Sequence, residues 1–320
     1  MNWIRKILRA GEKIRKVIKE RPSVKEMADS LWKSCPSCRK LTSKEKIREN
    51  YFICECGFHF DIPPRERLAR LGFLNGKYEV IASPEYSDPD PLKFEYCGTK
   101  YISKRKNYQK ITKQETALFC VYGKIGSISS VVVCSNFKFG GGAWSPDESE
   151  HFVTAAQKAI DEKVDLFLTI FQTGGVAVTT GVTGLASAMV KSTIALENLK
   201  KHNIVTIAIA SSKTTGGPYA SAFFNHELVG IESSSSTDIL FSGKRVSANV
   251  SQNSTIPEDF GNALRVQKSG LCDFVLNNRH EIRATVLTLT KILKKKNKTT
   301  SVEATNENQE DPQQITSAAS

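Results

Sequence analysis

From Ala117 onward, short apolar runs alternate with longer amphipathic stretches, which is the pattern of strands followed by helices. Two apolar runs around Gly126, residues 118–125 and 128–136, predict a β-hairpin. Further strands are predicted at residues 164–171, 204–210, 228–231, 239–241 and 272–276, and helices at 147–163, 178–201, from Tyr219, at 258–269 and at 280–296. The alternation predicts an α/β layer fold with its core in residues 116–296.

The segments outside this core have different patterns. Residues 1–30 begin with a basic amphipathic helix; docking on another protein and binding to a membrane surface are both open, while Glu12 and Glu20 argue against a transit peptide. Residues 63–115 are rich in Pro, Asp, Lys and Tyr and are predicted to be a connector with a short helix at 65–71. Residues 297–320 are polar and are expected to be a disordered tail.

Two glycine doublets each end a predicted strand and open a predicted helix. Gly174 and Gly175 follow the run 164–171, and Gly216 and Gly217 follow the run 204–210. Because glycine has no Cβ and the first amides of a helix lack intrahelical acceptors, two such turns side by side would form a cradle of N–H donors for a negative oxygen. The alternative is that the glycines only make tight strand-to-helix turns.

Composition and charge narrow the class of protein. The chain of 320 residues is 40% hydrophobic, enough for a globular core, and has a formal net charge of +12. This charge favours phosphate-bearing partners without choosing among coenzymes, nucleic acids and lipids. No apolar run reaches the roughly 18 residues of a membrane span, so we expect a soluble, intracellular protein.

Four of the eight cysteines lie close together in the segment 31–62, which predicts a zinc ribbon. Cys35 and Cys38 have the usual two-residue spacing, whereas Cys54 and Cys56 are one residue too close. A structural zinc ion held by all four cysteines, a site in which His59 replaces Cys54, and a degenerate site without metal are therefore all open.

The core lacks several common catalytic motifs. It has no G-x-x-x-x-G-K-[ST] loop, no G-x-S-x-G elbow and no H-E-x-x-H helix, and each of its histidines stands alone in the sequence. Lone histidines are given no catalytic role. Catalysis by backbone N–H groups, with the proton acceptor supplied by a substrate or partner, is the chemistry that remains.

At several points the sequence resembles one family, the β subunit of the acetyl-coenzyme A carboxylase carboxyltransferase of bacteria and plastids. The resemblance covers residues 31–293 and rests on the order and spacing of its motifs. They are Leu-Trp-x-x-Cys-Pro-x-Cys at 31–38, Ile-Cys-Glu-Cys-Gly-Phe-His at 53–59, Asp-Pro-Leu-Lys-Phe at 90–94, Thr-Gly-Gly at 173–175, Lys-Thr-Thr-Gly-Gly-Pro-Tyr-Ala-Ser at 213–221 and Leu-Phe-Ser-Gly-Lys-Arg-Val at 240–246.

The resemblance implies a zinc ribbon ahead of a crotonase-like core, located in the cytoplasm or the plastid stroma. It implies an enzyme that acts with a separate α subunit, a biotin carboxyl carrier protein and biotin carboxylase, and that moves a carboxyl group from biotin on the carrier to acetyl-CoA, giving malonyl-CoA for fatty acid synthesis. The amides of Gly174 and Gly175 would bind the thioester oxygen, Gly216 and Gly217 would support the pocket, and Lys244 and Arg245 would contact coenzyme phosphates or a partner. A solvated pair at a strand end is the alternative for these two cations.

The sequence also departs from the family pattern. The family continues the first doublet as Gly-Gly-Ala-Arg-Met-Gln-Glu, whereas this chain has Val176-Ala-Val-Thr-Thr180 after Gly175 and loses the arginine and the acid. Backbone donors survive this change, so a divergent copy could keep the chemistry. Two other functions stay open: nucleic-acid binding by the basic ribbon and N-terminal helix over a silent core, and a different acyl-CoA reaction on the same fold.

Overall fold

The computed structural model describes residues 31–73, 77–85, 90, 92–96, 98–234, 237–250 and 256–307. The N-terminal helix predicted within residues 1–30 and the end of the predicted tail, residues 308–320, lie outside this part. The chain divides into two units, Met1–Phe60 and Asp61–Ser320. Among the described residues, no helix is both long and apolar enough to cross a membrane.

The first unit is small and holds the four clustered cysteines. Its elements are β1 (Trp32–Ser34), β2 (Leu41–Ser43) and α3 (Lys44–Glu49). β1 and β2 pair antiparallel, and Ser43 caps α3 by accepting a hydrogen bond from the Lys46 amide. Its buried apolar cluster consists of only Cys35, Ile47, Cys54 and Phe60 among the described residues, so a bound metal would add substantially to its stability.

The second unit is built on one main sheet of strands in the order β12-β10-β9-β8-β7-β6-β3, with β11 pairing beside β9. The strands are β3 (Tyr78–Ile81), β6 (Leu118–Ile125), β7 (Ile128–Ser135), β8 (Leu166–Thr173), β9 (Val205–Thr215), β10 (Leu228–Glu232), β11 (Asp238–Leu240) and β12 (Phe274–Leu276). β6 and β7 form the predicted hairpin, and β7, β8, β9, β10 and β12 are parallel.

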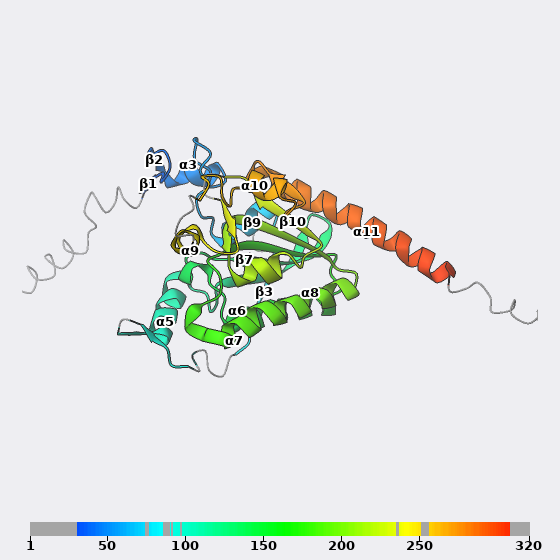
Figure 1. Ribbon diagram of the computed structural model, residues 1–320. Coiled ribbons are helices and arrows are strands. Elements are labelled where there is room, and N and C mark those ends of the chain that lie inside the picture. Colours follow the sequence, from blue (N-terminus) through cyan, green and yellow to red (C-terminus); the bar gives the residue numbers. More distant parts are fainter. Residues whose placement is uncertain are drawn as a thin grey trace, which may run out of the picture. The chain divides into compact units, whose positions relative to one another are not determined.

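Helices cover both faces of this sheet (Figure 1). They are α4 (Pro64–Leu71), α5 (Tyr101–Thr112), α6 (Pro146–Asp161), η3 (Val178–Thr180), α7 (Gly181–Leu185), η4 (Ala186–Lys191), α8 (Ser192–Lys201), η5 (Tyr219–Phe223), α9 (Lys244–Val250), α10 (Ala263–Lys268), η6 (Arg279–Glu281) and α11 (Ile282–Glu307). Short elements β4 (Glu95–Tyr96), β5 (Thr99–Lys100) and η2 (Gly140–Gly142) complete the described part.

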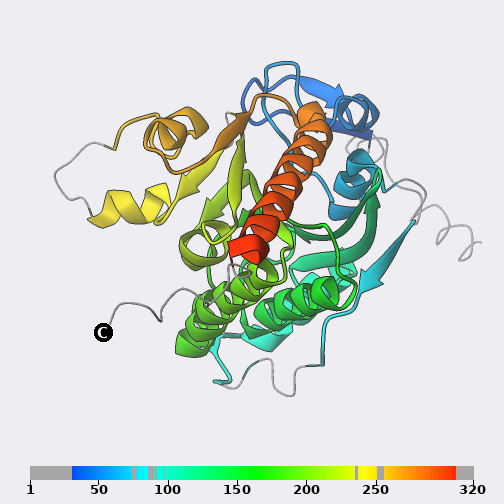
Figure 2. The ribbon, with the colours of Figure 1, turned by 90° about the vertical axis from the view of Figure 1, so that its right-hand side faces the viewer.

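Alternate residues of the buried strands face opposite helix layers, as expected for a sheet covered on both sides. Val131 and Val133 of β7 pack in the cluster that includes Phe152 of α6, while Val132 packs with Val286 of α11. Figure 2 shows α11, coloured orange to red, running across its face of the sheet. The predicted α/β layer fold is therefore confirmed.

Several predicted elements differ in detail. The single helix predicted at 178–201 is divided into η3, α7, a π-helical turn and α8. β9 continues beyond residue 210 to Thr215, and α11 continues to Glu307, into the segment expected to be disordered. The predicted connector 63–115 contains α4 and α5, which belong to the second unit.

Candidate functional site

The two glycine doublets meet at the carboxyl ends of neighbouring parallel strands. Thr173 of β8 pairs with Thr214 of β9, so the turns that follow the two strands lie side by side. A Cβ placed on Gly216 would lie 2.8 Å from the Cα of Gly175, which leaves no room for a side chain. Gly175 and Gly216 also have φ values of 115° and 74°, which favour glycine. The predicted juxtaposition of the two turns is confirmed.

The amides of the first doublet are already occupied by hydrogen bonds within the chain. Gly174 N–H donates to the Gly141 carbonyl oxygen at 2.9 Å, and Gly175 N–H donates to Thr173 Oγ1 at 3.1 Å. In the second turn, Gly216 N–H donates to the Phe241 carbonyl oxygen at 3.0 Å. The assignment of Gly174 and Gly175 as oxyanion donors therefore needs correction, because in this conformation their protons point at protein acceptors.

Two other amides in the same turns remain for a ligand. Within the described part of the chain, the N–H groups of Val176 and Gly217 donate no hydrogen bond. Gly217 opens a helical turn in which Ala220 N–H donates to the Gly216 oxygen at 3.1 Å, so its own N–H has no intrahelical acceptor. A Cβ on Gly217 would lie 2.6 Å from Val176 Cγ2, which shows that the two residues are adjacent. Sequence reasoning missed Val176 because it attended to the glycines.

The backbone of Trp144 forms two hydrogen bonds with the first turn. Its N–H donates to the Gly175 oxygen at 2.9 Å, and its carbonyl accepts from Ala177 N–H at 2.7 Å. The indole is fully buried and stacks on Phe171 of β8, with ring centroids 6.1 Å apart. Val176 is thus held between two hydrogen bonds made by its neighbours, so its own N–H has a fixed direction.

A buried ion-pair network fixes the segment that carries Trp144. Glu148, fully buried in α6, accepts from the amides of Ser145 at 2.8 Å and Ala117 at 2.9 Å. Arg105 of α5 lies 3.3 Å from Glu148 and 2.5 Å from Asp147. Burial raises the pKa of Asp147, and the Arg105 charge opposes this shift. Ser145 and Glu148 also form a capping box, in which each side chain bonds to the backbone of the other at the N-terminus of α6.

A second buried network lies where β9 and β10 end. Glu232 of β10 is fully buried between Arg67 of α4 and Arg279 of η6, with Arg279 Nε 2.9 Å from Glu232 Oε2. Ser211 of β9 accepts from Arg67 Nη2 at 2.5 Å and donates to Glu232 Oε2 at 3.2 Å. The Glu232 carboxylate of β10 is thereby linked to α4, η6 and β9, the strand that precedes the second glycine turn.

The buried histidines of the second unit have structural partners. His226 accepts from Thr169 Oγ1 at 2.9 Å and donates from Nδ1 to the Ala222 oxygen at 2.7 Å. Burial lowers the pKa of His226 to about 4, so the ring is neutral at neutral pH. His151 lies between Thr116 and the Ile81 oxygen, and burial lowers its pKa as well. Both rings act as packed hydrogen-bond links.

Lys244 and Arg245 begin helix α9 instead of ending a strand. Their side chains lie outside the described part of the structure. Their contact with coenzyme phosphates or a partner stays a prediction.

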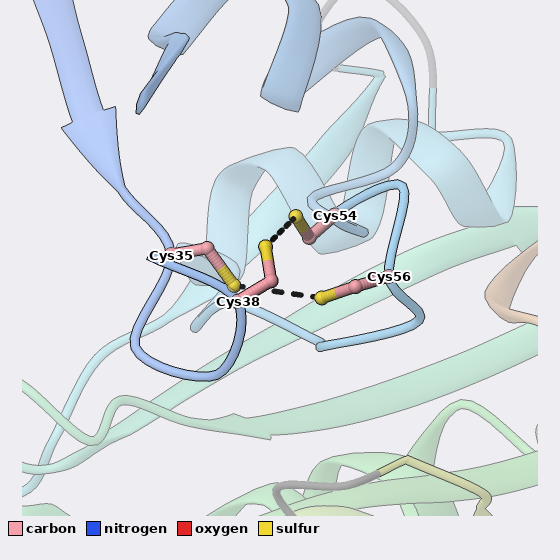
Figure 3. A group of neighbouring side chains, drawn as sticks. All are labelled: Cys35, Cys38, Cys54 and Cys56. Carbon is pink, nitrogen blue, oxygen red and sulfur yellow. Dashed lines mark hydrogen bonds between the residues drawn. The ribbon is translucent and has the colours of Figure 1, made fainter. Parts of the chain in front are cut away.

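In the first unit, the four predicted cysteines come together (Figure 3). All four Sγ atoms lie within 4.8 Å of one another, and the Cys35–Cys56 and Cys38–Cys54 pairs are each separated by 3.7 Å. Four thiolates around a tetrahedral zinc with Zn–S bonds of about 2.3 Å are roughly 3.8 Å apart, so the set fits zinc. The short Cys54–Cys56 spacing is accommodated by a turn in which Gly57, at φ 82°, donates to the Cys54 oxygen at 2.8 Å.

His59 does not join this group. Its backbone pairs with Ile53 in an isolated β-bridge. Among the described residues, the group of potential metal ligands consists of the four cysteine sulfurs and does not include the His59 ring. The Phe58 amide donates to the Cys56 sulfur and lowers the pKa of that thiol to about 6, whereas the pKa of the Cys54 thiol is raised, since a hydrogen bond from the Cys56 amide is outweighed by burial together with the neighbouring cysteine side chains. The geometry favours the four-cysteine set over the histidine alternative.

Comparison with known proteins supplies the family. Residues 92–319 match the family described as "Carboxyl transferase domain". The chain belongs to the carboxyl transferase family. A relative from Pelagibacter ubique, named acetyl-coenzyme A carboxylase carboxyl transferase subunit beta, is 33% identical over 321 residues and covers 100% of both chains. A relative of the same name from Allorhizobium ampelinum is 31% identical over 92% of each chain.

Solved structures of carboxyl transferase type share the fold. The transcarboxylase 12S structure with methylmalonyl-coenzyme A and methylmalonic acid bound matches with a TM-score of 0.57 and 17% identity, over 78% of this chain and 44% of that one. A Pseudomonas malonate decarboxylase hetero-tetramer in complex with malonate matches with a TM-score of 0.54 and 17% identity, over 72% and 82%. The comparisons give no support to the nucleic-acid-binding alternative.

Proposed function

We propose that the chain is the β subunit of an acetyl-CoA carboxylase carboxyltransferase, which transfers a carboxyl group from biotin on a carrier protein to acetyl-CoA and yields malonyl-CoA. The observation that carries the proposal is the likeness to β subunits of this name over the whole chain. The paired turns at the ends of β8 and β9 support it, because they present free amides where two strands end together.

The N–H groups of Val176 and Gly217 are the oxyanion donors in this proposal. Carboxyl transfer to the methyl carbon of a thioester requires an enolate, whose negative charge develops on the thioester oxygen. Two amides fixed before the reaction stabilise that charge without reorganisation, and losing one such donor costs about 10²–10³ in rate. Gly174, Gly175 and Gly216 then act as supports, since their own hydrogen bonds and absent side chains hold the two turns together.

The proton acceptor would come from outside the two turns. Residues 173–177 and 215–219 contain no carboxylate and no imidazole. Biotin on the carrier protein would supply the carboxyl group and, once it has lost that group, the base. The role of this chain is to bind the thioester and hold its oxygen at the Val176 and Gly217 amides. Lys244 and Arg245 remain candidates for the coenzyme phosphates.

We further propose that the first unit is a zinc ribbon. Cys35, Cys38, Cys54 and Cys56 would hold one structural zinc ion, which closes the coordination shell and leaves no open position for catalysis. The small apolar cluster of this unit supports a stabilising role for the metal.

An apolar stripe beside the first turn is the surface that we assign to the α subunit. Its side chains are exposed by 48–86% and lie along η3, α7, η4 and α8: Val178, Val182, Leu185, Val190 and Ile194. A stripe of this kind marks a protein interface. The β-subunit names of the relatives support a partner subunit, and the stripe begins two residues after Val176, so the partner would adjoin the donor amides. The biotin carboxyl carrier protein and biotin carboxylase complete the proposed set of partners.

The proposal is tested by reconstitution. The full chain, mixed with an α subunit and a carboxylated biotin carrier, should convert acetyl-CoA to malonyl-CoA, and the chain or the α subunit alone should not. A folded and assembled complex that forms no malonyl-CoA would refute the proposal. If it forms a different acyl-CoA product, the alternative acyl-CoA reaction would replace it.

A further inference from the structure

A cavity of about 630 Å³ lies at the edge of the main sheet opposite the glycine turns. It is lined by the end of α4, the hairpin between β6 and β7 and the first turn of α11. Ile125 and Ile128 pair at this edge, whereas the glycine turns follow the other ends of β8 and β9. The eight residues of β8 alone span about 25 Å. The cavity is therefore separate from the proposed carboxyltransferase site.

Among the described residues, three cations and no carboxylate line this cavity. Lys77, Lys124 and Arg283 are exposed, and none of them forms an ion pair or a hydrogen bond with another described residue. Some other surface cations of the same unit do have acidic partners; Lys158, for example, pairs with Glu79 and Glu162. Three uncompensated cations around one cavity create a local positive potential that attracts anions.

One of these cations lies against the backbone of two glycine turns. Gly72 ends α4 with φ 100°, and a Cβ built on it would lie 2.8 Å from Arg283 Nε. A Cβ on Gly126, in the hairpin, would lie 3.7 Å from Arg283 Nη2. The guanidinium therefore packs closely over two glycine turns that come from different parts of the sequence.

We propose that this cavity binds a small molecule that carries at least two adjacent phosphate groups. Arg283 supplies a planar fork that suits two phosphate oxygens, and Lys77 and Lys124 supply point charges for a neighbouring phosphate. The volume lies in the range of pockets that enclose small organic ligands. A single phosphate or sulfate would leave part of the positive charge uncompensated, so the site should prefer polyphosphates.

The test measures binding of tripolyphosphate to the full chain by isothermal titration calorimetry. We expect one saturable site, at least about tenfold weaker binding to sulfate, and at least about tenfold weaker tripolyphosphate binding by Arg283→Gln and by Lys124→Gln. Lys268→Gln is the charge-matched control, because Lys268 is an exposed cation of α10 outside the cavity. It should change the affinity less than about twofold.

A second pair of variants separates geometry from net charge. Gly72→Ala keeps every charge but displaces the Arg283 guanidinium, and should weaken tripolyphosphate binding about tenfold. Gly270→Ala introduces the same kind of backbone strain, at φ 71°, with nothing within 4 Å of the new Cβ, and should bind normally.

Three outcomes would overturn the proposal. They are the absence of saturable binding, an equal loss of affinity in Lys268→Gln and Arg283→Gln, and a single-stranded oligonucleotide that occupies the site more tightly than tripolyphosphate. The second would assign the binding to the overall positive charge, and the third would assign the cavity to nucleic acid. None of these measurements depends on carboxyltransferase activity, so their failure would leave the proposed function untouched.

Discussion

The contact between the two glycine turns can be tested by adding one methyl group. In Gly216→Ala the new Cβ would lie 2.8 Å from the Gly175 Cα and 3.8 Å from the Val176 nitrogen. Carbon atoms in contact are normally about 3.5–4.0 Å apart, so the first turn must move by roughly 1 Å. The moving segment carries the Val176 amide, which is one of the two proposed donors.

The size of the effect follows from this displacement. A misplacement of about 1 Å at a catalytic group can cost about 10²-fold, and the loss of an oxyanion donor costs about 10²–10³ in kcat. The alanine also adopts φ near 74°, a left-handed conformation that costs about 1–2 kcal/mol of stability. Gly270→Ala has nearly the same φ, 71°, with open space around the Cβ, and therefore isolates the strain.

The assay is malonyl-CoA formation by the reconstituted complex, together with thermal unfolding of both variants. We expect kcat to fall about 100-fold in Gly216→Ala and less than about twofold in Gly270→Ala. Both variants should lose Tm from backbone strain, and Gly216→Ala should lose more because its Cβ also displaces the first turn. Equal activity in the two variants would refute the assignment of the donors to the paired turns.

The remaining predictions concern the metal, acid stability and subunit assembly. Cys54→Ser should lower bound zinc below about half an equivalent, whereas His59→Gln should keep about one; metal analysis of the purified variants checks this, and the reverse pattern would restore the histidine site. Because the pKa of His226 falls from 6.5 to about 4 on folding, its contribution to stability is complete above pH 6.5 and decreases by about 3 kcal/mol as the pH drops to 4. Urea unfolding at about pH 7 and pH 4.5 should show a smaller acid loss in His226→Gln; an unchanged loss would exclude the ring as its source. Val182→Asp should weaken α-subunit binding at least about tenfold in sedimentation velocity, whereas Asn198→Asp, exposed on α8, should not; normal assembly of Val182→Asp would place the interface elsewhere.

The sequence was sufficient to predict the layers of the fold and the positions of most strands. Apolar runs marked β6, β7 and most of β8, because buried strands must be apolar on both faces. The end of β9 was missed because Ser211, Ser212 and Thr214 are polar, yet all three are buried. Ser211 is tolerated there because it bonds to Arg67 and Glu232, which are 144 and 21 residues away in the chain. A short stretch of sequence around Ser211 does not contain these partners, so it cannot show that a polar residue is tolerated in the buried strand.

The position of the two turns was predicted from the sequence, whereas the amides that we propose as donors were chosen only from the structure. The doublets at residues 174–175 and 216–217 located the turns, since glycine is required where two backbones touch. An amide is free only if no acceptor of the folded chain lies next to it. The acceptor of the Gly174 amide is the Gly141 oxygen, which belongs to a separate turn more than thirty residues earlier in the sequence. The cysteine cluster was predicted completely, because metal ligands must be close in space and these lie on two short turns.

The buried side chains of Arg67 and Arg105 determine how far the chain can be truncated from its N-terminus without unfolding. The sequence pattern suggests a catalytic fragment that starts near residue 116, but Arg67 and Arg105 lie before that point and partner the fully buried carboxylates of Glu232 and Glu148. A fragment without them would keep Arg279 beside Glu232 and would leave Glu148 without an ion-pair partner among the described residues. Since removing one member of a buried ion pair costs about 3–5 kcal/mol, truncation at this apparent boundary should unfold the unit. The smallest independently folding piece therefore begins before α4, close to residue 61.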